Sequence, residues 1–435
     1  MSKNSNLHNA KNAKNDEFYT RRCDIENELK YYKEHFRNKV VYCNCDDPLW
    51  SNFFKYFYDN IQYLGIKKLI TTHYEENNQS YKLEVYNEGI PKGFFDTNNV
   101  ENIVNDIPEP LRHLPVYKIP LEGDGDFRSE ECIEILKEAD IVVSNPPFSN
   151  FRPYVAQLIE HNKKFIIWGN NNAITYKEIF PLIKDNKMWL GYTANKTLSF
   201  RVPDDYKYDE KETAKINDGY HYGKVPAISV FTNLDIEKRN EEMILWANFD
   251  IEKYPMYDNY CAFNVDKCAE IPMNDEIIIR VDEEKLEQMK SVYGDDLEEL
   301  GNGEVKIRRP IWGTPITFVS NYNPEQFEIV SFRKGSDDKD LVFTRERERE
   351  FNRTFESWFA GDENGINRLW TNEQSERYKS EWEEQICKDS DKKKEPIDIC
   401  YHSSTNLCGV IKNAEGSING ENKYARILIR RKELF

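Results

Sequence analysis

The chain has 435 residues, of which 39% are hydrophobic and 31% are charged, so it is long enough for roughly two or three folded units with a highly charged surface. A net charge of −17 excludes a uniformly basic nucleic-acid-binding surface, although it leaves local basic clusters open. The nine cysteines are an odd number without a Cys-x-x-Cys pair, which argues against a disulfide framework or a metal site and favours buried thiols in a reducing cytoplasm.

Residues 1–17 are mostly polar. The stretch "MSKNSNLHNAKNAKND" contains no apolar segment of the kind that a signal peptide needs, so we expect a disordered arm. No apolar run along the chain reaches the length of a membrane span, so we expect no membrane partner and a cytoplasmic location.

Short apolar runs alternate with amphipathic helical patterns over residues 18–235. Strands are predicted at 39–44, 67–74, 140–145, 163–170 and 227–235, and helices at 49–65, 129–139, 151–162 and 176–186. Gly65 is the expected end of the first helix and Ser129 the expected N-cap of the second. Strands that alternate with helices predict an α/β domain with a mainly parallel sheet.

The pattern is looser over residues 236–435. It predicts an acidic helix over 282–304 that ends in a glycine-rich turn, and strand-like segments over 312–332 and 423–432. Residues 335–405 carry runs such as "TRERERE" and "SDKKKEP" around a tryptophan-rich stretch, which indicates a charged helical insert.

The strand predicted at 140–145 runs directly into Asn145, Pro146, Pro147 and Phe148. Two prolines have no N–H to donate, so they end the strand at its carboxyl end, where open α/β sheets bind ligands. The Asn145 side-chain oxygen and the Pro146 carbonyl form a pair of uncharged acceptors. Such a pair suits the two N–H bonds of a conjugated amine, because it draws the nitrogen toward tetrahedral geometry and frees its lone pair for a methyl group. Phe148 supplies a ring that can stack on a base.

Other interpretations of the same four residues stay open. An ordinary proline turn needs no catalytic role, although the position between a buried strand and a helix favours one. The acceptor pair suits the amine of adenine, the amine of cytosine and the side-chain amide of a protein glutamine alike.

Seven stretches of the chain resemble the EcoRI-type adenine-specific DNA methyltransferases. In the order of the family they are "KVVYCNCDDPLWSNFFKYF", "GDFRSEE", "DIVVSNPPFSNFRPYVAQLIE", "NAITYKEIFPLIKDNKMWLGYT", "VPAISVFTNLD", "TPITFVSNYNPEQFEIV" and "YARILIRRK". The resemblance implies a Rossmann-like methyltransferase sheet over residues 18–235 and a target-recognition and C-terminal region over 236–435. It also implies methyl transfer from S-adenosylmethionine, without a metal, to a flipped adenine of double-stranded DNA, with the four residues 145–148 as the catalytic motif. The sequence does not show the oligomeric state, for which we favour a monomer.

The resemblance places the methyl donor beside the loop that follows the first strand, at Asn44, Cys45, Asp46, Asp47 and Pro48. Many methyltransferases have a glycine-rich loop there, whereas this chain has no glycine before residue 65. From the residues alone, an acidic turn that caps the next helix explains this stretch equally well.

Three further contacts to the donor are implied at other strand ends. Glu75, with Glu76 as an alternative, is the candidate for the ribose hydroxyls, and Asp126 with Phe127 is the candidate for the donor's adenine. A glycine-rich turn with a capping aspartate explains Asp126 as well. Asn170 to Asn172 either shape the pocket or satisfy a turn.

A flipped base requires backbone contacts around the opening, and several basic groups are available for them. They are Arg21/Arg22, Lys163/Lys164, 306–310, Arg333/Lys334 and 426–432. Each is as well explained by a solvated surface patch. The segments 276–309 and 336–405 look like additions to the family pattern, and target reading is expected within 236–311 and 335–405.

The leading prediction is therefore an adenine-specific DNA methyltransferase of a restriction–modification or phage-protection system. The alternatives are a cytosine-amine or protein-glutamine methyltransferase that uses the same motif, and a non-catalytic DNA-binding relative. Absence of DNA binding would favour the glutamine enzyme, and absence of donor binding would favour the non-catalytic relative.

Overall fold

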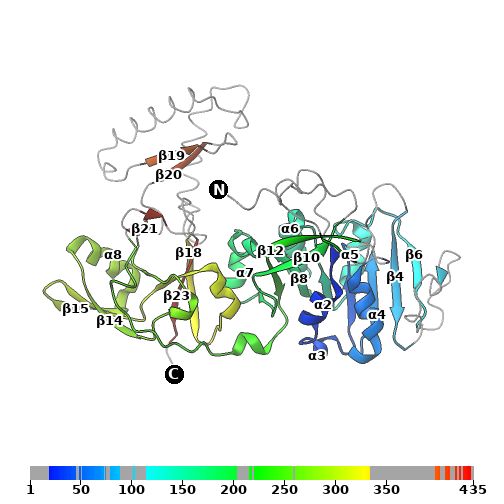
Figure 1. The fold of residues 1–435 in the computed structure, drawn as a ribbon, viewed down its shortest axis with the longest axis horizontal. Coiled ribbons are helices and arrows are strands. Elements are labelled where there is room, and N and C mark those ends of the chain that lie inside the picture. Colours follow the sequence, from blue (N-terminus) through cyan, green and yellow to red (C-terminus); the bar gives the residue numbers. More distant parts are fainter. Residues whose placement is uncertain are drawn as a thin grey trace. The chain divides into compact units, whose positions relative to one another are not determined.

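The chain forms two compact units, residues 1–239 and 240–435 (Figure 1). The computed structural model describes residues 19–45, 49, 51–72, 74, 79–88, 101–102, 114–202, 215–217, 220–257, 260–333, 397–401, 407–411, 417–418, 421–422 and 425–432. The predicted arm, 1–17, lies outside these ranges. Within them, no helix combines the length and the apolar composition that a membrane span requires.

Among the described residues, the first unit contains one twelve-stranded sheet. Its strands are β1 (Tyr19–Thr20), β2 (Val40–Cys43), β3 (Lys68–Thr72), β4 (Tyr81–Tyr86), β5 (Glu101–Asn102), β6 (Tyr117–Pro120), β7 (Ile141–Ser144), β8 (Lys164–Asn170), β9 (Trp189–Leu190), β10 (Lys196–Arg201), β11 (Lys215–Asn217) and β12 (Tyr220–Thr232). They lie in the order β1-β10-β12-β8-β7-β2-β3-β4-β6-β5, with β9 and β11 paired to β12.

Only the centre of this sheet is parallel. The pairs β8–β7, β7–β2 and β2–β3 are parallel, whereas β12 and β4 pair antiparallel with the strands at either side of that centre. The prediction of a mainly parallel sheet is therefore wrong for the flanks. The chain between β3 and β4 spans only 73–80, which is too short for the crossover that a parallel neighbour needs.

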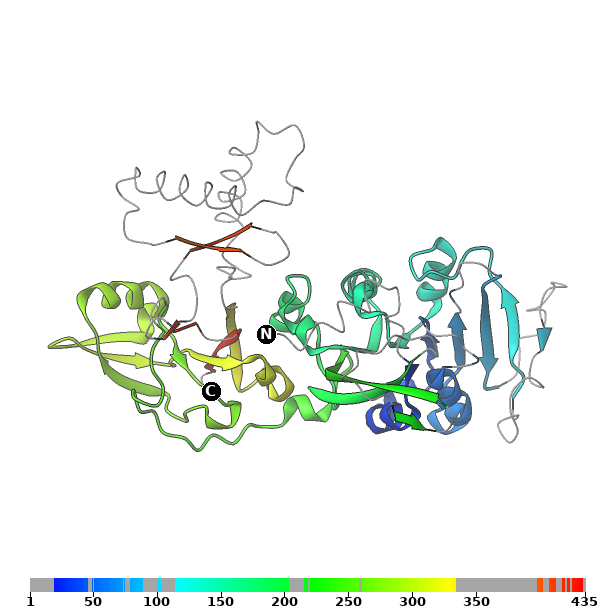
Figure 2. The same cartoon turned by 45° about the horizontal axis from the view of Figure 1, so that its top comes forward.

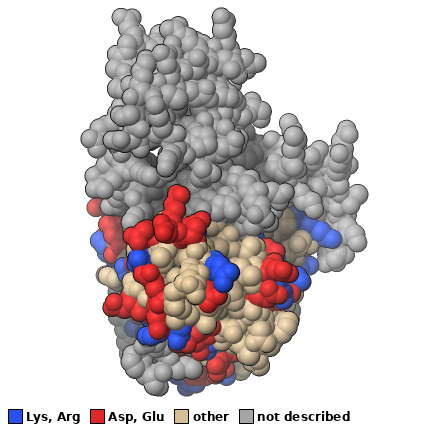
Figure 3. All heavy atoms as spheres, turned by 90° about the vertical axis from the view of Figure 1, so that its left-hand side faces the viewer, with Lys and Arg blue, Asp and Glu red and all other residues tan. Residues whose placement is uncertain are grey.

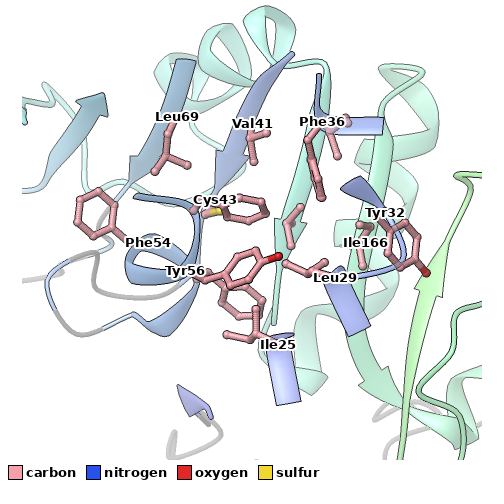
Figure 4. Close-up of a cluster of buried hydrophobic side chains, with 14 of the residues drawn as sticks. Ile25, Leu29, Tyr32, Phe36, Val41, Cys43, Phe54, Tyr56, Leu69 and Ile166 are labelled. Carbon is pink, nitrogen blue, oxygen red and sulfur yellow. The ribbon is translucent and has the colours of Figure 1, made fainter. Parts of the chain in front are cut away.

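Helices cover both faces of the sheet. They are α2 (Arg22–Leu29), α3 (Lys33–Phe36) and α4 (Asn52–Leu64) on one side, and α5 (Glu130–Glu138), α6 (Phe151–Glu160) and α7 (Phe180–Lys184) on the other, as Figures 1 and 2 show. The first group buries Leu29, Phe36 and Phe54 against Val41 and Leu69 of the sheet (Figure 4). Because side chains alternate along a strand, the neighbours of these sheet residues face the second group.

The predicted helix end at Gly65 and the predicted N-cap at Ser129 are confirmed, whereas the first helix begins at Asn52 and not at residue 49. Ser51 Oγ accepts from Phe53 N at 3.2 Å, and the helix ends at Gly65, whose φ of 64° is left-handed. Ser129 Oγ accepts from Cys132 N at the start of α5. The helix predicted over 176–186 is shorter, because Pro181 has no N–H to bond to a preceding turn and is tolerated only in the first turn of a helix.

The second unit contains two main sheets within the described residues. One has the order β13-β17-β23-β18, and the other has the order β14-β16-β15 beside the helix α8 (Glu283–Tyr293). Their strands are β13 (Phe263–Asn264), β14 (Glu276–Arg280), β15 (Leu297–Gly301), β16 (Glu304–Arg308), β17 (Trp312–Pro315), β18 (Phe327–Arg333) and β23 (Arg426–Arg431). The strands predicted within 312–332 and 423–432 are confirmed, with a 3-10 helix, Ile316–Asn321, between the two in the first segment.

One prediction for this unit needs correction, and another falls mostly outside the described residues. The helix predicted over 282–304 ends at Tyr293, because the glycine-rich turn is a hairpin turn between β15 and β16, with Gly301, Asn302 and Gly303 all at positive φ. The helical insert predicted over 335–405 lies outside the described residues except at 397–401, which form the strand β19 (Ile397–Tyr401) paired with β20 (Leu407–Ile411). The short strands β21 (Ser417–Ile418) and β22 (Glu421–Asn422) pair with each other.

Candidate active site

The strand order reverses between β2 and β7. The chain passes from β2 to β3 on one side, while β7 and β8 lie on the other side of β2, so the carboxyl ends of β2 and β7 are adjacent at this reversal. This is the place at which open α/β sheets bind ligands. Asn44 directly follows β2 and Asn145 directly follows β7, so the fold brings these two predicted site residues to one edge.

Hydrogen bonds tie the two strand ends together. Ser144 Oγ donates to the backbone carbonyl of Asn44, and Tyr154 Oη donates to the side-chain Oδ1 of Asn44. Asn44 and Asn145 are 6% and 5% exposed, and Tyr154 is completely buried. Burial raises the pKa of Tyr154 well above its ordinary value, so its hydroxyl stays protonated and remains a donor.

The loop after β2 takes a glycine-like conformation without a glycine. Cys45 has a φ of 72°, in the left-handed region that non-glycine residues rarely adopt. Such strain is typically retained at functional sites, where a sharp turn brings the backbone close to a ligand. Of the other residues predicted in this loop and at the end of β3, Asp46, Asp47, Pro48 and Glu75 lie outside the described residues, as does Glu76.

The loop around Asp126 joins the same assembly through its neighbour. Gln157 Nε2 of α6 donates to the Phe127 carbonyl at 3.0 Å, and the Phe127 ring lies edge-on to Tyr154 with 5.1 Å between ring centroids. Asp126 Oδ1 accepts from the Arg128 backbone N and Nε, both at 2.8 Å. The Arg128 side chain lowers the pKa of Asp126. Within the protein, the contacts of Asp126 are therefore those of a turn. Its contact to the methyl donor stays a prediction.

The motif residues occupy the segment between β7 and α6. Asn145 and Pro146 are buried, whereas Pro147 and Phe148 are half-buried. Phe148 packs against the core and begins a 3-10 turn, Phe148–Asn150, that leads straight into α6. The prediction of a buried strand, a proline stop and a helix is confirmed in that order.

The position of α6 depends on the absence of a side chain at Gly169. A Cβ at this residue of β8 would lie 2.4 Å from Cε2 of Phe151, the first residue of α6. We expect Gly169→Ala to lower the free energy of unfolding by about 2 kcal/mol, because the ring or the helix must move. Urea denaturation checks this against Gly223→Ala, where the nearest atom is 3.5 Å away. Equal urea midpoints for the two variants would contradict the close packing.

Asn170 makes a turn contact, whereas Asn171 contacts strand β12. Asn170 Oδ1 accepts from Asn172 N at 2.9 Å, and Asn171 Oδ1 accepts from Ser229 Oγ at 2.9 Å. The first bond favours the turn interpretation for Asn170.

Most of the predicted basic groups that the structure describes are held by the protein's own acids and carbonyls. Arg21 pairs with Asp24, Arg22 with Glu26 and Asp59, Lys306 and Arg308 with Glu276 and Glu298, Arg309 with Asp296, Arg426 with Asp266, Arg430 with Glu328, and Arg431 with Asp275. Lys163 and Lys164 donate to backbone carbonyls. Figure 3, which faces the end with α8 and β15, shows acidic and basic side chains interspersed. These contacts favour solvated surface patches for the exposed groups, whereas Arg426 is buried.

Tyr154 and Ser144 were not predicted as site residues. The local sequence pattern predicts only that Tyr154 is a buried position of an amphipathic helix. It does not predict that the hydroxyl contacts a loop 110 residues earlier in the chain. Only the pairing of β2 with β7 creates that contact.

Comparison with known proteins identifies the family. The family model for "Adenine-specific methyltransferase EcoRI" matches residues 6–290 and 309–432. The Type II methyltransferase M.EcoRI of Escherichia coli is 44% identical over 341 residues, which are 78% of this chain and 92% of that protein. M.MgeORF184P of Mycoplasma genitalium is 37% identical over 74% of this chain and 84% of its own length, and M.MpnI of Mycoplasma pneumoniae is 35% identical over 74% and 83%. No solved structure matches the chain.

The unmatched residues 291–308 fall within the first predicted addition, 276–309, and they contain all of β15 and all of β16. The second predicted addition, 336–405, lies inside the matched range. With the family model matching most of its length and M.EcoRI matching over most of both chains, this chain belongs to the EcoRI family of adenine-specific methyltransferases.

Proposed function

We propose that this methyltransferase transfers the methyl group of S-adenosylmethionine to the exocyclic amine of an adenine flipped out of double-stranded DNA. The observation that carries the proposal is Asn145, nearly buried at the end of β7 and beside Asn44 where the strand order reverses. The printed description of the family, adenine-specific methyltransferase, favours adenine over cytosine or a protein glutamine.

The carboxyl ends of β2 and β3 suit a methyl donor that carries polar groups of its own. Thr71 Oγ1, in the register position beside Cys43, is buried and has no hydrogen-bond partner in the described part of the chain. A buried hydroxyl left in this state costs free energy unless something else pairs with it. Together with the strained Cys45, it supports binding of the donor at the loop after β2, with Asn44 among its contacts. Asp46, Asp47, Pro48, Glu75, Asp126 and Phe127 stay proposed contacts to the same donor.

The chemistry divides between the donor and the chain. When bound, S-adenosylmethionine supplies a methyl group already activated by a sulfonium sulfur. Asn145 Oδ1 and the Pro146 carbonyl accept the two N–H bonds of the target amine and orient its lone pair toward the methyl carbon. Phe148 stacks on the flipped base. Burial of Asn145 and Pro146 excludes water from the acceptors, which strengthens both hydrogen bonds.

The remaining parts of the proposal concern the type of sheet, the region that recognises the target and the biological role. The parallel centre β8-β7-β2-β3 with helices on both faces supports a Rossmann-like methyltransferase sheet. We assign target recognition to the second unit, which is compact in its own right. The relatives are named Type II methyltransferases and come from bacteria, which supports a restriction–modification role in the cytoplasm, where bacterial DNA lies.

The direct test is to incubate the protein with plasmid DNA and labelled S-adenosylmethionine and then to map the methylated bases. We expect label on the exocyclic amine of adenine at one short sequence. Label on cytosine, or label on protein but not on DNA, would overturn the proposed substrate. Absence of label together with absence of donor binding would favour a non-catalytic relative.

Removal of the Phe148 ring tests the base contact separately. We expect Phe148→Ala to weaken binding of a duplex with an extrahelical target base by about tenfold, because one stacking contact is worth roughly 1–3 kcal/mol. Titration with S-adenosylhomocysteine should give an unchanged affinity, and Phe148→Tyr, which keeps the ring, should bind the duplex like the parent protein. A loss of donor affinity without a loss of duplex affinity would move Phe148 to the donor site.

A further inference from the structure

Tyr154 connects three segments that the proposed function assigns to different tasks. It lies on α6, the helix that follows the catalytic motif, and its hydroxyl donates to Asn44 Oδ1 in the proposed donor loop. Its ring packs against Phe127 with 5.1 Å between centroids. Because the side chain is completely buried, these contacts are fixed by packing on all sides.

The hydrogen bond to Tyr154 determines which way the Asn44 amide faces. A primary amide has an acceptor oxygen and a donor NH2 group on opposite branches. Tyr154 binds the oxygen, so the NH2 group is directed away from α6. Ser144 Oγ holds the backbone carbonyl of the same residue. Ser144 and Tyr154, which lie on either side of Asn145 in the sequence, therefore hold both oxygens of Asn44. Among the described residues, this leaves the NH2 group of the Asn44 amide available to bind a ligand.

We propose that Tyr154 is a positioning residue that sets the affinity for the methyl donor by orienting the Asn44 amide toward the carboxylate of the donor's amino-acid part. This inference rests on the proposed function. The carboxylate is the strongest acceptor on the donor, whereas the ammonium nitrogen has no lone pair and the positive charge of the sulfonium sulfur makes it a very poor acceptor for an N–H. The same contact makes the donor loop and the catalytic segment one rigid assembly.

The test compares two ligands in the full-length protein and in three variants. S-adenosylhomocysteine carries the amino-acid part and 5′-methylthioadenosine lacks it. We expect Tyr154→Phe to bind S-adenosylhomocysteine about tenfold more weakly, because a buried acceptor loses its donor while the ring is kept, and to bind 5′-methylthioadenosine unchanged. The double variant Tyr154→Phe/Asn44→Ala should bind S-adenosylhomocysteine no more weakly than Asn44→Ala alone, because the tyrosine acts through Asn44.

Kinetics supply a second readout. We expect the KM for S-adenosylmethionine to rise about tenfold in Tyr154→Phe while kcat at saturating donor stays within about twofold, because the lost contact serves binding and not the reacting amine. Tyr293→Phe is the matched control: it removes a buried hydroxyl that donates to the Cys261 carbonyl at 2.8 Å in the other unit. Its affinity for S-adenosylhomocysteine should equal that of the parent protein.

The outcomes separate this inference from the proposed function. If the parent protein binds S-adenosylhomocysteine but Tyr154→Phe binds it equally well, the positioning role is wrong and the proposed function stands. If Tyr154→Phe weakens both ligands equally, the tyrosine supports the fold of the site and not the amide. If the parent protein binds neither ligand, the donor site itself is wrong.

Discussion

Asn145→Ala should reduce kcat for methyl transfer by about 10³-fold while the affinity for S-adenosylhomocysteine stays within about twofold. Removal of one preorganised hydrogen-bonding group at a reacting centre typically costs ~10²–10³ in rate. Here the lost group is one of the two proposed acceptors for the amine, and the residue follows β7 at the edge where the proposed donor and base meet. Single-turnover methylation of plasmid DNA measures the rate, and calorimetric titration measures the affinity.

Two further variants make this result specific. Asn145→Asp keeps an acceptor oxygen, so it should retain more activity than the alanine variant. Asn233→Ala also removes an asparagine whose side-chain amide makes two hydrogen bonds, from Phe165 N at 3.0 Å and to the Lys163 carbonyl. These bonds lie at the amino end of β8, away from the proposed site. It should keep its kcat at temperatures where it is folded. An Asn145→Ala protein that loses donor binding as severely as activity would mean that this amide holds the donor instead of the amine.

The parts of the site that could be predicted depend on local sequence. Neighbouring residues are enough to predict strand β7, the proline stop after it and the start of α6. The reason is that proline geometry and apolar runs act on the chain locally. The same holds for the helix ends at Gly65 and Ser129. The identity of the reaction came from a resemblance carried by seven stretches, and the four-residue motif alone would have left adenine, cytosine and glutamine open.

The parts that could not be predicted depend on contacts between distant segments. The antiparallel flanks of the sheet, and the bond from Tyr154 to Asn44, exist only after β2 pairs with β7 and β8 pairs with β12. The left-handed Cys45 was missed for a different reason. The usual signal for that conformation is glycine, and here a strained cysteine takes its place. Acidic composition over 282–304 also concealed a hairpin, because charge runs do not distinguish an exposed helix from an exposed strand.

Lys68→Met should lower the free energy of unfolding by about 3 kcal/mol, which is the lower end of the cost of breaking a buried ion pair. The Lys68 side chain is 5% exposed, and its Nζ lies 3.1 Å from Glu84 Oε1, whose side chain is 1% exposed. Methionine fills a similar volume but leaves the Glu84 carboxylate buried with Lys82, at 2.9 Å, as its remaining cation. For a unit of this size, the loss corresponds to a fall in Tm of roughly 6–12 °C.

The matched control is Lys39→Met. Lys39 Nζ is 3.7 Å from Asp140 Oδ1, and both side chains are more than 40% exposed. An exposed pair of this kind contributes at most about 1 kcal/mol, so its unfolding midpoint should stay close to that of the parent protein. Lys68 begins β3 and Lys39 directly precedes β2, so both lie at the edge of the sheet opposite Asn44 and Asn145, and the methylation rates of both variants should be unchanged where they are folded.

The pH dependence identifies the ion pair as the source of the effect. Burial by itself would raise the pKa of Glu84, but the ammonium groups of Lys68 and Lys82 outweigh burial and hold its pKa below the ordinary 4.5. A carboxylate with a lowered folded-state pKa stabilises the fold fully above pH 4.5, and this contribution is lost as the pH falls through the folded-state pKa. Lys68→Met raises that pKa, so the gap in unfolding free energy between parent and variant should narrow from pH 7 to pH 3.5. Urea titrations at both pH values measure the gap, and a constant gap would mean that the loss comes from packing around residue 68 and not from its charge.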